Sequence, residues 1–81
     1  MRLDKYLKVS RLIKRRTVAG EACSSGRVSV NGKIAKPSHD VKVGDIIELS
    51  FGARTTKVEV LSLPETVSKD AASGTYREIT D

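Results

Sequence analysis

The chain has 81 residues, with 15 Lys or Arg against ten Asp or Glu, and a formal net charge of +5. We expect one small domain, because this length leaves no room for a second, catalytic one. A single Cys and a single His exclude an internal disulfide and a zinc site, which needs three or four such ligands.

Two short helices are expected first. Leu3 and Leu7 have the spacing of an apolar helical stripe. If this helix continued unbroken, Lys14 would lie on the same buried face as the two leucines. We therefore expect a break between Val9 and Lys14, with four apolar side chains of this stretch pointing inward: Leu7, Val9, Leu12 and Ile13.

The second helix is expected to start at Thr17, whose side chain is a good N-cap. Its packed face would use residues spaced by three and four, namely Val18, Ala19, Ala22 and Cys23. The segment "SSG" ends this helix, with Gly26 in the left-handed position that commonly follows a helix.

A β-hairpin is expected next, in "GRVSVNGKIAK". Val28 and Val30 alternate with polar residues, and Asn31-Gly32 fits a two-residue type I′ turn. Residues 33–36 then return as the second strand, and Pro37 closes the hairpin.

Two further strands follow the turn "VKVGD". One runs over 46–51, and a turn at 52–53 joins it to another that runs to Leu61 with β-branched residues on one face. The predicted fold class is therefore α+β, with two short N-terminal helices packed on a small antiparallel sheet of four to five strands.

From Ser62 the chain becomes polar. We take 1–61 as the domain and 62–81 as a short, partly ordered C-terminal extension. In the extension, "SKDAAS" suits one or two helical turns, and "TYREI" suits an edge strand with Tyr76 and Ile79 packed on the domain. Disorder is the alternative.

The positive charge lies at one end of the chain. Residues 1–36 have a net charge of +8, from ten Lys or Arg against two acids, whereas residues 37–81 have a net charge of −3, from five against eight. A one-sided field attracts a polyanion and orients the protein as it binds. Like charges crowded on a small fold repel each other, and a bound polyanion would offset that repulsion.

These basic residues predict an RNA-binding surface. Arginine grips a phosphate with two parallel hydrogen bonds, so we expect Arg2, Arg11, Arg15 and Arg16 to make the directed contacts. The full candidate set is Arg2, Lys5, Lys8, Arg11, Lys14, Arg15, Arg16, Arg27 and Lys33. Aromatic residues are too few for a platform that stacks single-stranded bases, which favours folded or helical RNA.

Asp4 is an acidic residue within this basic segment. It either pairs with Lys8 one helical turn later or sits favourably in the first helical turn. Alternatively it holds a neighbouring arginine in position, or contacts an RNA 2′-hydroxyl or a partner protein.

The basic segment has three alternative interpretations: a solvated helix face, a membrane-binding helix, or a surface for an acidic protein. The membrane interpretation is disfavoured because Leu3 and Leu7 are needed for the core. No apolar run suits a signal peptide or a membrane span, so a cytoplasmic protein is expected.

No enzyme chemistry is expected. His39, the single histidine, lies in the polar loop "PSHD" and is expected at the surface, and Cys23 has the spacing of a core residue. Asp40, Asp45 and Glu48 match no calcium or magnesium motif, so we expect no metal and no cofactor.

Four motifs together resemble the S4-type RNA-binding domain, first named for a small-subunit ribosomal protein. They are "RLDKYL", "SRLIKRRTVA", "GRVSVNG" and "VKVGD", and they span about Arg2 to Asp45. The resemblance implies two helices packed on a strongly bent sheet, the αL motif, with a basic helical face on structured RNA. Its implied RNA-facing residues are the same nine basic side chains.

Stand-alone members of this type resemble the families of heat-shock protein fifteen and of ribosome-associated quality-control factor P. The short, acidic C-terminal extension favours the second. That resemblance implies a monomeric, non-enzymatic, ribosome-associated factor on large subunits that stalled with peptidyl-tRNA. It would contact rRNA and tRNA, and would work with a larger protein that recruits alanyl-tRNA for C-terminal alanine tailing. A role in subunit recycling or assembly is the alternative.

Overall fold

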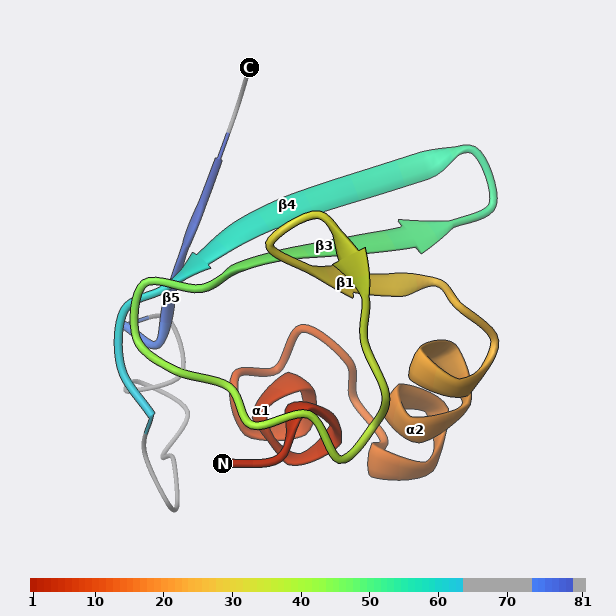
Figure 1. Ribbon diagram of the computed structural model, residues 1–81, viewed down its shortest axis with the longest axis horizontal. Coiled ribbons are helices and arrows are strands. Elements are labelled where there is room, and N and C mark those ends of the chain that lie inside the picture. Colours follow the sequence, from red (N-terminus) through yellow and green to blue (C-terminus); the bar gives the residue numbers. More distant parts are fainter. Residues whose placement is uncertain (64–73, 80–81) are drawn as a thin grey trace.

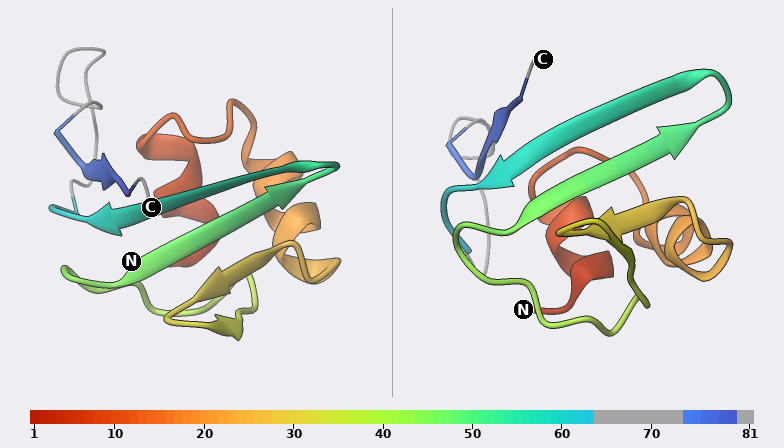
Figure 2. Two further views of the ribbon diagram at one scale, coloured as in Figure 1. Left: turned by 90° about the horizontal axis from the view of Figure 1, so that it is seen from above. Right: turned by 45° about the horizontal axis from the view of Figure 1, so that its top comes forward.

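The computed structural model describes residues 1–63 and 74–79 as two helices packed against one face of an antiparallel sheet. The helices are α1 (Leu3–Val9) and α2 (Arg16–Ser24). Figures 1 and 2 show both helices on the same side of the sheet. The α+β fold class predicted from the sequence is confirmed.

Five strands form the sheet, in the order β2-β1-β3-β4-β5. Their bounds are β1 Val28–Val30, β2 Lys33–Ile34, β3 Ile46–Phe51, β4 Arg54–Val60 and β5 Tyr76–Glu78. All neighbouring strands pair antiparallel. The sheet is bent, and β5 crosses at a steep angle to the long strands β3 and β4 (Figure 1).

The break between the helices is confirmed. Helix α1 ends at Val9 with Ser10 as its C-cap, and Arg11 adopts a φ of 65°, a left-handed conformation that stops an L-residue helix. The N–H of Ile13 then donates to the carbonyl of Leu7 at 3.0 Å, which returns the Ile13 side chain to the core. Of the four side chains expected to point inward, Leu7 and Ile13 are buried, whereas Val9 and Leu12 are only half-buried.

Two details of the second helix differ from expectation. The N-cap is Arg15, which is extended and makes no side-chain cap, so Thr17 lies inside the first turn. The expectation for Val18 is also wrong, since it is 40% exposed. The packed face of α2 is narrower than predicted and consists of Ala19, Ala22 and Cys23.

The first hairpin forms around the expected turn. Asn31 and Gly32 both have positive φ, of 53° and 85°, as a type I′ turn requires. Strand β2 is shorter than the predicted 33–36, because Ala35 turns into the core. Its N–H still donates to the carbonyl of Val28, at 3.1 Å.

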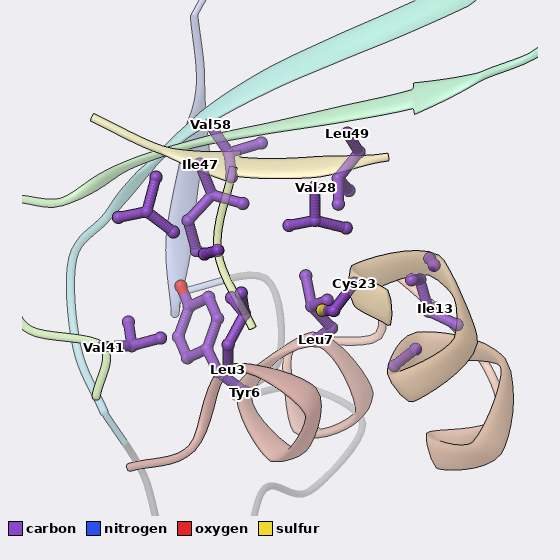
Figure 3. Packing of buried hydrophobic residues seen from close by; sticks show 14 of the residues in the cluster. Leu3, Tyr6, Leu7, Ile13, Cys23, Val28, Val41, Ile47, Leu49 and Val58 are labelled. Carbon is purple, nitrogen blue, oxygen red and sulfur yellow. The ribbon is translucent and has the colours of Figure 1, made fainter. Parts of the chain in front are cut away.

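The core forms where the helices meet the inner face of the sheet (Figure 3). Leu3, Tyr6 and Leu7 of α1 have no exposed surface, and neither do Ile47 and Val58 opposite them. Figure 3 shows the α1 side chains pointing toward those of the sheet. The apolar residues that anchor α1 therefore face away from the basic side chains of the same helix.

The chain returns to the domain at residues 74–79. The hydroxyl of Tyr6 donates to the carbonyl oxygen of Thr75 at 2.6 Å inside the core. Burial raises the pKa of Tyr6 to about 12, so the hydroxyl stays protonated and remains a donor. The expected edge strand is confirmed as β5, with Tyr76 packed against the core. The helical turns suggested for "SKDAAS" lie outside the described residues, and the boundary at 61/62 stays a prediction.

The outer face of the sheet carries charges of both signs in pairs. Glu48 lies opposite Lys57, with 4.0 Å between the charged groups, and Glu59 lies opposite Arg77, at 2.5 Å. Opposite charges on facing strands stabilise a sheet modestly. This face is therefore not the place where unbalanced positive charge collects.

Candidate nucleic-acid interface

The nine basic residues of the predicted set lie on two parts of the fold. Two lie at the first hairpin, with Arg27 just before β1 and Lys33 at the start of β2. The other seven lie on the helices and the turn between them: Arg2, Lys5, Lys8, Arg11, Lys14, Arg15 and Arg16. All nine are exposed except Lys5, which is half-buried.

Asp4 brings two of the arginines together. Arg2 donates from Nε to one carboxylate oxygen of Asp4 and from Nη2 to the other, both at 3.2 Å. The Nη2 atom of Arg16 lies 3.7 Å from Oδ1 of the same carboxylate. The Asp4 side chain is 10% exposed, whereas those of Arg2 and Arg16 are 55% and 51% exposed. A mostly buried carboxylate thus holds two guanidinium groups that remain open to solvent, an arrangement called here the Arg2–Asp4–Arg16 cluster.

Two local features of the chain create this cluster. The first turn of α1 is fixed because the N–H groups of Leu3 and Asp4 donate to the carbonyls of His39 and Pro37, at 2.8 and 3.1 Å. These bonds satisfy helix N–H groups that have no partner within the helix. The break after Ser10 then reverses the chain, so that the start of α2 returns to the start of α1.

The cluster bears on the alternatives for Asp4 that concern contacts within the chain, whereas a contact with an RNA 2′-hydroxyl or a partner protein stays a prediction. In the part of the chain that the structure describes, the Asp4 carboxylate pairs with Arg2 and Arg16 and not with Lys8. It also accepts a hydrogen bond from the N–H of Lys5 at 2.7 Å. The expected position in the first helical turn and the expected contact with a neighbouring arginine both hold.

The two hairpin residues line other hollows than the one that Arg2 lines. Arg27 lines a hollow together with Val18 and Phe51, and Lys33 lines another with His39. Neither hollow includes Arg2 or Arg16 among its described residues. A role for Arg27 and Lys33 in the same RNA contact therefore stays a prediction.

Sequence reasoning left out Lys36, which lies beside Arg2. Both residues line one groove between the end of α2 and the segment after β2. Lys36 belongs to the basic block 1–36 and directly precedes Pro37, so composition alone could have marked it. The sequence could not show that Lys36 and Arg2 line the same groove, because that depends on where the hairpin packs.

The single cysteine, Cys23, is buried. Burial, helped by the nearby Asp4 carboxylate, raises the pKa of Cys23 to about 11, which keeps the thiol protonated and unreactive at neutral pH. Among residues 1–63 and 74–79, no three His, Cys, Asp or Glu side chains gather closely enough to hold a metal ion. In the same residues, no helix has the length and apolar character needed to cross a membrane.

Comparison with known proteins gives consistent matches. Residues 1–47 match the S4 domain family. The RQC P-site tRNA stabilizing factor of Streptococcus pneumoniae is 52% identical over 81 residues, which cover 100% of this chain and 92% of the relative. The protein of the same name from Bacillus subtilis is 53% identical over 76 residues, covering 94% of this chain and 88% of the relative.

The fold also matches a solved structure. Heat Shock Protein 15 of Vibrio cholerae, described as trimeric, superposes with a TM-score of 0.89 at 32% sequence identity. The match covers 98% of this chain and 81% of the other. The arrangement of helices and sheet is therefore common to both proteins.

Proposed function

The chain belongs to the S4 domain family, and from this premise we propose that it is a non-enzymatic RNA-binding factor of ribosome-associated quality control. It binds large ribosomal subunits that stalled and dissociated with peptidyl-tRNA still attached, and contacts both the rRNA and the tRNA. It holds the P-site tRNA while a larger partner, which recruits alanyl-tRNA, extends the nascent chain with alanine. We place it in the cytoplasm as a monomer that associates with ribosomes.

The observation that carries this proposal is the Arg2–Asp4–Arg16 cluster. One carboxylate forms ion pairs with two guanidinium groups, which both remain about half exposed. The N–H groups of each guanidinium that Asp4 does not engage can donate to a phosphate. Because Asp4 has already ordered both side chains, less entropy is lost when RNA binds. The neighbouring basic residues add longer-range attraction.

The relatives support the ribosomal part of the proposal. Proteins that share about half of this sequence over nearly their full length are named for stabilising P-site tRNA in RQC. The likeness to Heat Shock Protein 15 favours a second candidate, a related role in recycling or assembly of large subunits. Both candidates require the same RNA-binding face, and they differ in whether the bound subunits carry peptidyl-tRNA.

The salt dependence of the affinity for rRNA tests whether the protein binds RNA through phosphate contacts. If about five phosphates are contacted, the logarithm of the affinity for rRNA should fall against the logarithm of salt concentration with a slope of about −4. Fluorescence titration of the full chain with a large-subunit rRNA fragment measures this slope. A slope near zero would contradict an interface made of arginines and phosphates.

A substitution at Asp4 tests whether the carboxylate positions the two arginines. Asp4→Asn keeps the shape of the side chain and adds one positive charge to the protein, so charge alone predicts tighter RNA binding. We expect the affinity instead to fall by about threefold, because Arg2 and Arg16 lose their common partner. Measured by the same titration, tighter binding would show that Asp4 acts only as a counter-charge.

A further inference from the structure

A groove lies beside the Arg2–Asp4–Arg16 cluster, between the end of α2 and the segment after β2. Its volume is about 560 Å³, within the roughly 300–1,000 Å³ of ligand pockets. Arg2 lines the groove and also pairs with Asp4, so the groove and the cluster are continuous. Figure 1 shows the segment after β2 running from the sheet toward the start of α1.

Part of the lining of this groove is aliphatic. Ile34, Ala35 and Pro37 line it, and Gly26 faces Ile34 without a side chain of its own. A Cβ atom on Gly26 would lie 3.7 Å from Cδ1 of Ile34. Ile34 is 72% exposed, more than any other large hydrophobic residue in the described part of the chain. A ligand that covered this side chain would remove apolar surface from water and stabilise the complex.

The lining of the groove also includes basic side chains. Arg2 and Lys36 line it, and none of its described lining residues is acidic. The hydroxyl groups of Ser24 and Ser38 also line it and can donate or accept hydrogen bonds. This lining complements a nucleotide. The aliphatic side chains match the flat base, the hydroxyl groups match the polar base edges, and the basic side chains match the phosphate.

We propose that this groove receives one unstacked nucleobase of an RNA that the cluster grips by its phosphates. The assignment rests on the proposed function, and it adds a specific contact to a surface otherwise suited to backbone recognition. The base lies against Ile34 and Pro37, while Arg2 and Lys36 meet the flanking phosphates. An apolar peptide would cover the same aliphatic side chains but would offer no anion to Lys36.

The scarcity of aromatic residues limits this contact to a single base. Tyr6 is buried, and the described residues that line the groove include no aromatic side chain. Aliphatic contact replaces aromatic stacking here, so no platform exists for a run of bases. The expected ligand is therefore a folded RNA with a bulged or flipped-out nucleotide.

Two RNA hairpins of equal length test the assignment, one fully paired and one with a single unpaired adenosine. The full chain should bind the bulged hairpin about fivefold more tightly. Ile34→Ala should abolish this preference while leaving the affinity for the paired hairpin unchanged. Val43→Ala is the matched control, because Val43 is 62% exposed and does not line the groove; it should keep the preference.

The outcomes separate this inference from the proposed function. Equal binding of both hairpins by the unaltered chain, with the expected salt dependence, would overturn the groove assignment and leave RNA binding standing. Binding of neither hairpin would overturn both. As a direct readout, the methyl resonances of Ile34 in NMR should shift with the bulged hairpin only. Unshifted resonances in the bound state would show that the unpaired base does not contact Ile34, and would refute the proposal.

Discussion

Arg2→Ala and Arg16→Ala are each expected to lower the affinity for large ribosomal subunits by about tenfold. A charge-assisted hydrogen bond contributes about 1.5–3 kcal/mol, so the loss of one directed phosphate contact corresponds to a tenfold change or more. Co-sedimentation of the variants with purified large subunits measures the effect. Unchanged sedimentation of both variants would show that the RNA-binding face lies elsewhere.

The single variants are preferable to the double variant for this test. Each single change leaves Asp4 one guanidinium partner, whereas the double change would leave a mostly buried carboxylate unpaired and destabilise the fold. Arg54→Ala is the matched control, because Arg54 is exposed at the tip of the β3–β4 hairpin, opposite the strand residue Phe51. It should sediment as the unaltered protein does.

Val30→Asp is expected to unfold the domain. Val30 is 4% exposed and lies in β1, between β2 and β3. The change removes core packing and buries an unpaired carboxylate, at a cost of about 3–5 kcal/mol. A small domain has only about 5 kcal/mol or somewhat more of stability to lose.

Circular dichroism and thermal unfolding measure this loss. Val43→Asp makes the same chemical change at a side chain that is 62% exposed, so its melting temperature should change little. If Val30→Asp also melted cooperatively at the original temperature, the assignment of Val30 to the core would be wrong.

Local sequence patterns predicted much of this fold. Asn31-Gly32 determines its turn almost alone, since two consecutive positive φ values suit few other residue pairs. The break after Val9 followed from Lys14, which a continuous helix would have buried. The start of α2 and the exposure of Val18 were predicted wrongly. Both depend on how the helix packs against the rest of the domain, which the spacing of its apolar residues does not determine.

The candidate site was predictable in composition but not in geometry. The sequence supplied the basic residues, and it left Asp4 with either Lys8 or an arginine as its partner. Only the folded chain brings Arg16 to the carboxylate that already holds Arg2, because the reversal between the helices sets that distance. For the same reason Lys36 was missed, since its proximity to Arg2 depends on the position of the segment after β2.

The most direct test is to purify the protein from cells with a C-terminal tag and to analyse what is bound to it. The proposed function predicts that large ribosomal subunits carrying peptidyl-tRNA copurify, and that Arg16→Ala reduces their yield under the same conditions. Recovery of the protein without large subunits, or with subunits that lack peptidyl-tRNA, would contradict a role in holding P-site tRNA.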